Sequence, residues 1–112
     1  MIATKNPLRG HIYFADIEEF GPHYWLVVSN NQRNAAYGDV LAVMLTTTAP
    51  KLPRPSYVAL NTRDGFEGWI ACDDITIVYR NELESLKGAL SPETMRAIDA
   101  GLSHALGIRF HR

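Results

Sequence analysis

The chain has 112 residues, of which 46% are hydrophobic, so we expect a single domain whose folding hides roughly two thirds of its extended-chain surface. Its 11 Lys and Arg residues nearly balance its 12 Asp and Glu residues, so a polyanion would have to be attracted by a local basic patch. No apolar run is long enough to span a bilayer, and residues 1–10 lack the apolar segment of a signal peptide, so we expect neither secretion nor a membrane location.

Three strands are predicted in the first part of the chain. Apolar residues recur with a period of two over residues 11–16, which predicts a half-buried strand. A second strand is predicted over residues 25–28, after a turn at the Gly-Pro pair 21–22, because glycine and proline favour turns. The continuous apolar run over residues 40–45 predicts a third strand that is buried on both faces.

A proline-rich loop is predicted over residues 46–55, where Lys51 and Arg54 are expected to face water, because prolines lack the amide donor that a sheet needs. Beyond the loop, the expected elements are strands at residues 57–60, 69–72 and 75–79, and one or two helical turns at 81–86. Five or six short strands at this spacing predict a mainly β fold, a small closed or nearly closed barrel.

The last predicted element is a helix over residues 92–106. Ser91 can cap it, Pro92 suits its first position and Gly107 can end it, which are the usual residues at these places. One stripe of the helix is apolar and should pack on the barrel as core; it consists of Met95, Ile98, Leu102 and Leu106.

Residue patterns typical of metal or nucleotide sites do not occur. The four histidines and Cys72 show no metal-ligand spacing, and the glycines form no phosphate-binding loop, so we expect no cofactor. Cys72 follows an apolar run, which predicts a buried thiol of low acidity and not a nucleophile. A lone cysteine cannot form an internal disulfide and favours a reducing compartment, so a cytoplasmic location is expected.

Several segments, in order along the chain, resemble those of the MazF/PemK family of toxin ribonucleases. Residues 9–13 (RGHIY) resemble the family's opening RGDIY, and residues 25–30 (WLVVSN) resemble its PVVVISN strand. The other matching segments are residues 41–47 with their final Thr pair, Leu52-Pro53, residues 72–75 in the family's acidic region, residues 90–95 at the start of the capped helix, and Leu106-Gly107. The resemblance covers about residues 8–108.

This resemblance implies an SH3-like β-barrel homodimer with a C-terminal helix. Members bind single-stranded RNA in loops near the dimer interface, and a cognate antitoxin peptide occupies the same groove to silence the toxin. Cleavage uses the RNA's own 2′-hydroxyl and no metal. The reaction needs a proton acceptor, a proton donor for the leaving 5′-oxygen, and a group that stabilises the crowded phosphorane.

The family's two catalytic positions are a Thr just after the third strand and an Arg just before the second. Thr46 matches the first position, and Thr47 offers a second hydroxyl beside it. The alternative is that residues 46–48 merely turn the chain. His23 stands at the Arg position; a histidine can take and give a proton, whereas an arginine is permanently charged.

His23 can also be interpreted as a solvated loop histidine. In that case Arg80, Arg54 or Arg63 would have to supply the positive charge. A catalytically lapsed barrel that only binds antitoxin or RNA is the corresponding alternative function.

The resemblance also indicates residues that bind RNA. Asp73 matches an acidic position that could bind a base edge or assist proton transfer, and its alternative role is to cap a turn. Basic residues beside exposed aromatics are the usual means of binding phosphates and stacked bases; the candidates are Lys51, Arg54, Tyr57, Arg63 and Trp69. The two aromatics could equally be barrel core.

A gyrase-poisoning toxin with the same barrel is a further alternative. Such toxins typically end in Trp-Gly-Ile, whereas this chain ends in Ile108-Arg109-Phe110-His111-Arg112. The missing tryptophan argues against this function.

Overall fold

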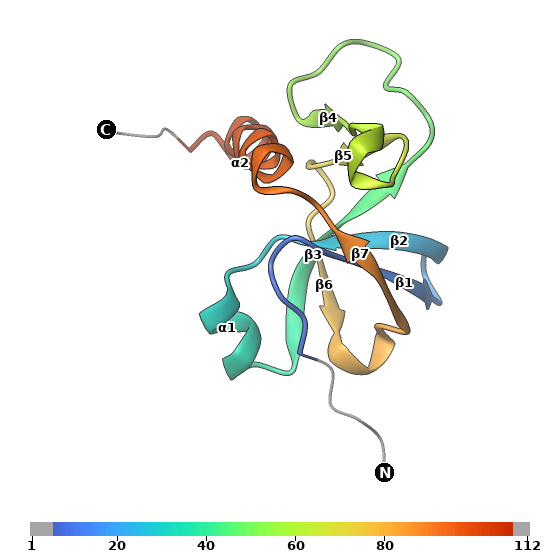
Figure 1. Ribbon diagram of the computed structural model, residues 1–112, viewed down its shortest axis with the longest axis vertical. Coiled ribbons are helices and arrows are strands. Elements are labelled where there is room, and N and C mark those ends of the chain that lie inside the picture. Colours follow the sequence, from blue (N-terminus) through green and yellow to red (C-terminus); the bar gives the residue numbers. More distant parts are fainter. Residues whose placement is uncertain (1–5, 109–112) are drawn as a thin grey trace.

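The computed structural model describes residues 6–108, which form a mainly antiparallel sheet followed by a helix (Figure 1). Residues 1–5 and 109–112 lie outside the described residues, and the latter are all but Ile108 of the tail compared with gyrase poisons. The strands are β1 (His11–Ile17), β2 (Gly21–Val27), β3 (Asp39–Thr46), β4 (Tyr57–Ala59), β5 (Trp69–Ala71), β6 (Thr76–Tyr79) and β7 (Ser85–Ala89). The helices are α1 (Asn31–Ala36), α2 (Pro92–Leu106) and two short 3-10 segments, η1 (Thr62–Asp64) and η2 (Arg80–Glu82).

Strand β3 is the centre of the sheet. The strand order is β4-β5-β3-β2-β1-β7, and β6 also pairs with β3. The first half of β3 pairs with β6, its middle with β2, and its last two residues, Leu45 and Thr46, with β5. The predicted mainly β, barrel-like fold with a C-terminal helix is therefore confirmed, although β4 and β7 end the sheet and do not close it.

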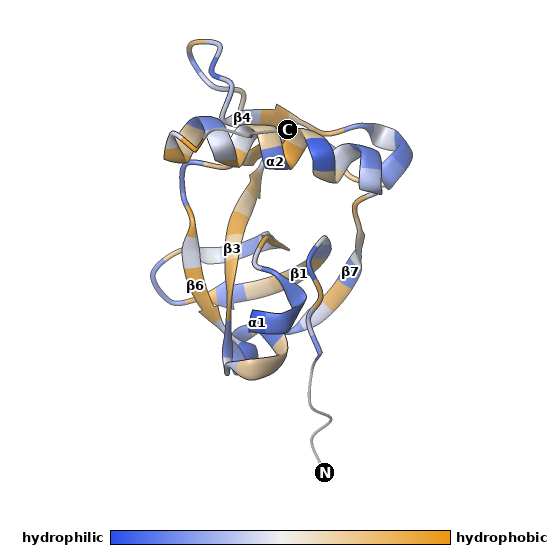
Figure 2. Cartoon of the chain, turned by 90° about the vertical axis from the view of Figure 1, so that its left-hand side faces the viewer, coloured by the Kyte–Doolittle hydropathy of each residue, from blue (hydrophilic) through white to orange (hydrophobic). Residues whose placement is uncertain are grey.

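The two faces of the sheet pack two separate apolar clusters. The first cluster includes Leu26, Val43 and Ile70 and is covered by α2, which lies across one end of the sheet (Figure 2). The second cluster includes Trp25 and Ala42. Because successive residues of a strand point to opposite faces, even positions of β2 and odd positions of β3 face the first cluster.

Helix α2 has the predicted bounds and caps. Ser91 accepts a hydrogen bond from the Thr94 amide, and Gly107 ends the helix with φ +72°. Three residues of the predicted apolar stripe pack on the first cluster: Met95, Ile98 and Leu102. The prediction was wrong for Leu106, which is 56% exposed, because the last turn of α2 lies beyond the apolar residues that Leu102 reaches.

The other departures from the sequence-based prediction concern short elements. The third, fourth, fifth and sixth strands occur within one residue of their predicted bounds, but Met44 and Leu45 in β3 are only half-buried. Strand β2 begins at Gly21 because this residue pairs with Ile17 of β1 and does not form a turn. At 81–86 the prediction of helical turns holds only for η2, and strand β7 was missed because most of its residues are exposed.

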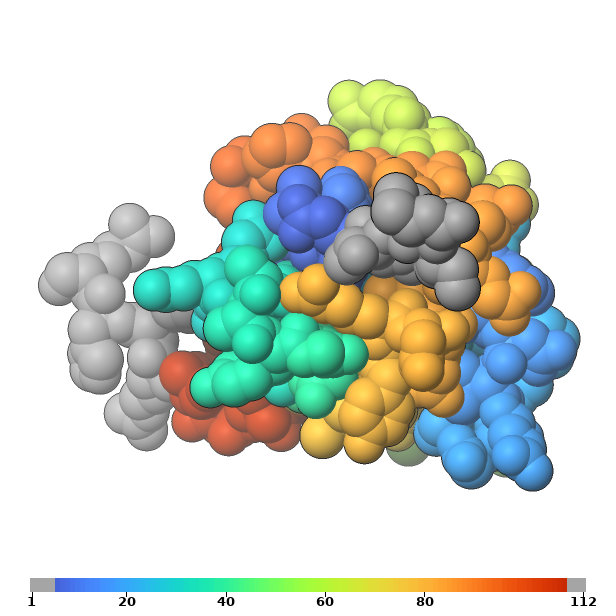
Figure 3. Space-filling model, turned by 90° about the horizontal axis from the view of Figure 1, so that it is seen from below, coloured from blue at the N-terminus to red at the C-terminus, as the bar shows by residue number. Residues whose placement is uncertain are grey.

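Helix α1 was also not predicted from the sequence. Asn30 caps it by accepting a hydrogen bond from the Arg33 amide. The buried Asn34 donates to the Ser29 carbonyl at 2.9 Å, and Arg80 donates to the Asn34 carbonyl. Figure 3, seen from below Figure 1, shows α1 beside the segment that carries Arg80. No helix among residues 6–108 is long and apolar enough to cross a membrane.

The packing of α2 predicts that Ile98 and Leu106 contribute very differently to the free energy of unfolding. Ile98 is fully buried, so Ile98→Ala should lower the free energy of unfolding by about 2–5 kcal/mol through lost burial and a residual cavity. Leu106→Ala is the matched control and should change it by less than about 0.5 kcal/mol. Urea denaturation of both variants checks this expectation, and equal losses would contradict the described packing of α2.

Candidate functional site

A cleft of about 540 Å³ opens between the end of β3 and the start of β4. It is lined by Thr46, Thr48, Ala49, Pro50, Lys51, Leu52, Pro53, Arg54 and Tyr57. The loop over residues 47–56 forms most of its wall and projects from the end of the molecule that carries α2 (Figure 1). The cleft therefore brings together three predicted site residues, Thr46, Lys51 and Arg54.

Thr46 is the last residue of β3, and its side chain has a defined orientation. Its Oγ1 accepts a hydrogen bond from the Thr48 amide at 3.1 Å. A hydroxyl also has one proton to donate, so this bond leaves Thr46 able to donate to a bound anion. The predicted alternatives, a turn residue and a functional residue, are thus compatible. Thr47 is exposed and does not line the cleft.

Arg54 is held at the cleft by two contacts. Its Nη2 lies 2.8 Å from Oδ2 of Asp73, and its guanidinium carbon lies 5.4 Å from the ring centre of Tyr57. The Arg54 and Asp73 side chains are 53% and 28% exposed, so the ion pair contributes at most about 1 kcal/mol and can be exchanged for another anion. Asp73 therefore reaches the site through Arg54 and does not line the cleft itself.

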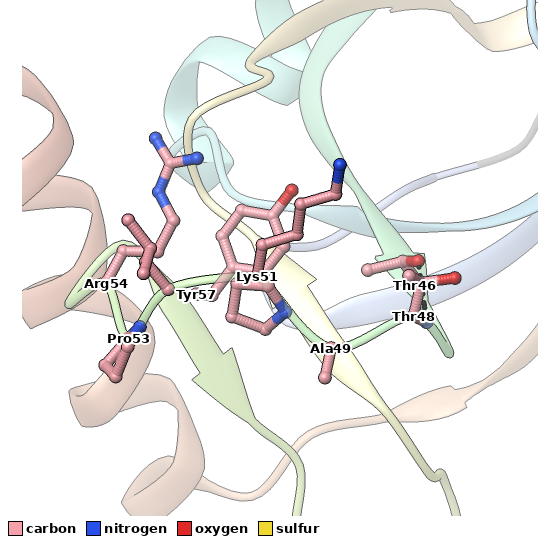
Figure 4. A pocket seen from close by; sticks show the side chains of 9 residues that line it. Thr46, Thr48, Ala49, Lys51, Pro53, Arg54 and Tyr57 are labelled. Carbon is pink, nitrogen blue, oxygen red and sulfur yellow. Dashed lines mark hydrogen bonds between the residues drawn. The ribbon is translucent and has the colours of Figure 1, made fainter.

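Basic, aromatic and hydroxyl groups follow one another along the cleft. In Figure 4 the side chains of Tyr57 and Lys51 lie between those of Arg54 and Thr46. Trp69 of β5 pairs with Thr46 on one side and with Ala59 of β4 on the other, and paired residues share a face of the sheet. Tyr57 and Trp69 are both half-buried, so each is partly core and partly accessible.

His23 lies within β2. The alternative interpretation, in which it is a loop histidine, is therefore wrong about its place in the fold. It pairs with Ala15 of β1 and is half-buried. Trp25 lies opposite Met44 of β3, so continuing this register by two residues places His23 opposite Thr46. Both residues are then on the face that carries the second cluster, because alternate residues of a strand share a face.

Only one of the three arginines that could replace the family's Arg borders this cleft, and it is Arg54. Arg63 lines a separate pocket of about 190 Å³, where Asp64 accepts hydrogen bonds from Ser91 and Thr94. Arg80 lies beyond Tyr79, which pairs with the first residue of β3, whereas Thr46 is the last. Arg63 and Arg80 are therefore not placed to supply charge beside Thr46.

Cys72 is a core residue, as the sequence predicted. It is fully buried against Gly101 of α2, where an added Cβ would lie 3.0 Å from its Sγ. Burial, together with the negative charge of Asp73, raises the pKa of the thiol to about 11. Within the part of the chain that the structure describes, no group of three or more His, Cys, Asp or Glu residues could hold a metal ion.

Gly68 is a site residue that sequence reasoning missed. A Cβ on Gly68 would lie 2.4 Å from the Thr46 carbonyl oxygen, so the two backbones are in direct contact. A glycine just before a strand is an ordinary turn signal, and nothing in the pattern indicated a contact with a residue so far away in sequence.

Comparison with known proteins shows the family to which the chain belongs. The family model of the PemK-like, MazF-like toxin of type II toxin-antitoxin systems matches residues 8–106. The endoribonuclease MazF4 of Mycobacterium tuberculosis is 40% identical over 102 residues, which are 91% of this chain and 94% of that protein. The chain belongs to the PemK/MazF-like toxin family. The endoribonuclease MazF1 of Mycobacterium bovis shows the same identity and coverage.

Solved structures of MazF-like proteins share the fold. An endoribonuclease in complex with its cognate antitoxin, from a mycobacterial species, is 39% identical with a TM-score of 0.85, covering 94% of this chain and 99% of that chain. An endoribonuclease from mycobacterial species is 36% identical with a TM-score of 0.86, covering 98% of this chain and 100% of that chain. The predicted MazF/PemK family and its fold are confirmed, and the predicted class of enzyme agrees with these relatives.

The raised pKa of Cys72 gives a test of its burial. At pH 8 a thiol with a pKa of about 11 is almost entirely protonated, and only the thiolate is a nucleophile. We expect a thiol-reactive dye to modify the native toxin at least about 100-fold more slowly than the protein unfolded in guanidinium chloride. Equal labelling rates in the two states would contradict the buried position.

Proposed function

We propose that this MazF-like toxin is a metal-independent endoribonuclease that cleaves single-stranded RNA by attack of the RNA's own 2′-hydroxyl. The observation that carries the proposal is the cleft in which Thr46, Lys51 and Arg54 meet, at the strand end where the register aligns His23. The family and the endoribonuclease names of its relatives support the same activity.

Each residue has a role that its chemistry allows. Thr46 donates its hydroxyl proton to a non-bridging phosphate oxygen, while its orientation is fixed by the Thr48 amide. His23 accepts the proton of the 2′-hydroxyl and then donates it to the leaving 5′-oxygen, so that one imidazole carries both proton transfers. Arg54 supplies the positive charge that a histidine does not hold permanently.

The loop over residues 47–56, here called the cleft loop, carries side chains that can hold a single strand of RNA. Lys51 and Arg54 bind phosphates, and the exposed Thr47 adds a hydroxyl at the rim. Tyr57 and Trp69 offer partly accessible rings on which bases can stack. Because the ion pair of Arg54 with Asp73 is weak and half-exposed, an RNA phosphate can take the place of the Asp73 carboxylate, which is then free to accept a hydrogen bond from a base edge.

We also propose that the protein acts in the cytoplasm as a homodimer that a cognate antitoxin inhibits by occupying the cleft. A similar mycobacterial endoribonuclease has been solved with its cognate antitoxin, which supports the partner. A barrel that has lost catalysis but still binds antitoxin or RNA is the second candidate, and the histidine at the family's Arg position is the observation in its favour.

A cleavage assay decides between these two functions. The wild-type protein should cut single-stranded RNA in excess EDTA. We expect His23→Ala to lower the rate roughly 10²–10⁴-fold, as for loss of a general acid or base, and Thr46→Ala to lower it roughly 10²–10³-fold, as for loss of one transition-state donor. Gel electrophoresis of a labelled RNA gives these rates.

Two control variants remove a histidine and a threonine at positions away from the cleft. His104→Ala and Thr62→Ala change exposed residues of α2 and η1 and should cleave as the wild type does. If the wild-type protein binds RNA without cleaving it, the nuclease proposal fails and the lapsed barrel is favoured.

If the basic residues of the cleft bind RNA phosphates, they should contribute to the salt dependence of RNA affinity. Each phosphate contact on a single strand contributes about 0.7 to the slope of log K against log salt concentration. Lys51→Ala and Arg54→Ala should each reduce this slope by about that amount, whereas Lys87→Ala, on exposed β7, should leave it unchanged. Binding titrations with an RNA whose 2′-hydroxyls are methylated measure affinity without cleavage.

A further inference from the structure

The four-residue loop 65–68, between η1 and β5, contacts the strand end that carries Thr46. Gly68 has φ +112°, a conformation that other L residues rarely adopt. A Cβ at this position would lie 2.4 Å from the Thr46 carbonyl oxygen, 3.2 Å from its carbonyl carbon and 3.4 Å from the Thr47 Cα. All three are backbone atoms, so any side chain on Gly68 has to displace the end of β3.

Hydrogen bonding and strand pairing to neighbouring residues hold Gly68 and Thr46 in place. The Gly68 carbonyl accepts a hydrogen bond from the Leu60 amide at 2.8 Å. The next residue, Trp69, pairs with Thr46 and with Ala59. The loop therefore cannot move away from Thr46 without breaking the β4–β5 pairing, and an enlarged Gly68 would push on Thr46 itself.

Phe66 attaches the same loop to β2. Its ring lies edge to face with Tyr24, with centres 6.1 Å apart and planes at 90°, and it packs on the first cluster. On its other side it meets β7, where a Cβ on Gly88 would lie 3.0 Å from the Phe66 ring. Tyr24 is the neighbour of His23 in β2, and the two side chains point to opposite faces.

We infer that two residues of loop 65–68 position the two catalytic residues relative to each other: Gly68 positions Thr46, and Phe66 positions the part of β2 that carries His23. The inference rests on the proposed function. Gly68 and Phe66 act as positioning residues: Gly68 contacts the Thr46 backbone, and Phe66 packs on the first cluster, on the face of the sheet opposite His23. A displacement of about 1 Å at a reacting group can cost roughly 10²-fold in rate, so one loop can control the chemistry.

Gly65 provides a matched control within the same loop. It also has a positive φ, +85°, but a Cβ there would meet nothing within 4 Å. Gly65→Ala therefore introduces the backbone strain of an alanine at positive φ without any collision, and Gly68→Ala introduces strain together with the collision at Thr46. The difference between the two variants isolates the contact.

The test compares kcat and KM for a short single-stranded RNA in EDTA. Gly68→Ala should lower kcat roughly 10–100-fold and change KM less than about 3-fold, whereas Gly65→Ala should keep kcat within about 3-fold of wild type. In a Thr46→Ala background, Gly68→Ala should have little further effect, since residues that act as a unit are non-additive. Equal kcat values for the two glycine variants, or multiplicative effects in the double variant, overturn the inference.

A second readout does not depend on activity. In amide NMR spectra, Gly68→Ala should shift the resonances of Thr46 and its neighbours, and Phe66→Leu should shift those around His23, while Gly65→Ala should shift neither. Phe66→Leu keeps an apolar side chain, so it serves if Gly68→Ala fails to fold. If the wild-type protein does not cleave RNA, the proposed function fails, whereas unshifted Thr46 and His23 resonances overturn the positioning inference itself.

Discussion

The register of β3 determines where every group of the site lies. This eight-residue strand pairs with β6, β2 and β5 in turn, and its two faces belong to different apolar clusters. A slip of one residue would exchange the faces, so that Thr46 would turn toward the cluster under α2 and Leu45 would turn away from it. Burial of Val43 with Ile70 and Ile98 on one face, and of Ala42 with Val78 on the other, therefore fixes the direction of the Thr46 hydroxyl.

The cleft loop complements this rigid strand end with a charged but restrained segment. Its three prolines, Pro50, Pro53 and Pro55, fix their own φ angles, which reduces the conformational entropy that the loop loses when it holds a ligand. In a chain whose charges nearly cancel, Lys51 and Arg54 place local positive charge at the cleft, and in the proposed function this charge attracts phosphate. Arg54 pairs with Asp73, and its guanidinium lies over the Tyr57 ring.

Sequence reasoning succeeded where a local pattern sets the structure. The alternation in β1, the apolar run of β3 and the caps of α2 depend on residues near in sequence, and the place of Thr46 at the end of β3 follows from the same apolar run. It failed at β7, whose mostly exposed residues carry no apolar alternation, and at Gly21-Pro22, which pair with β1 and do not turn. Gly68 acts through contact with Thr46 across the sheet, and no local pattern encodes such a contact.

The histidine at position 23 changes how the proposed mechanism depends on RNA binding. An arginine within β2 would hold permanent positive charge on the sheet itself, before any RNA arrives. Here the arginine that lines the cleft, Arg54, is on the loop over residues 47–56, is half-exposed and is paired with Asp73. In the proposed mechanism, the transition state would be stabilised fully only when a bound strand draws Arg54 away from Asp73 and toward the phosphate. An RNA that positions the loop poorly would lose rate as well as affinity, because binding energy is used to assemble the site. In the proposed mechanism, a histidine in the sheet together with an arginine on the loop would thus couple the choice of RNA to the chemical step.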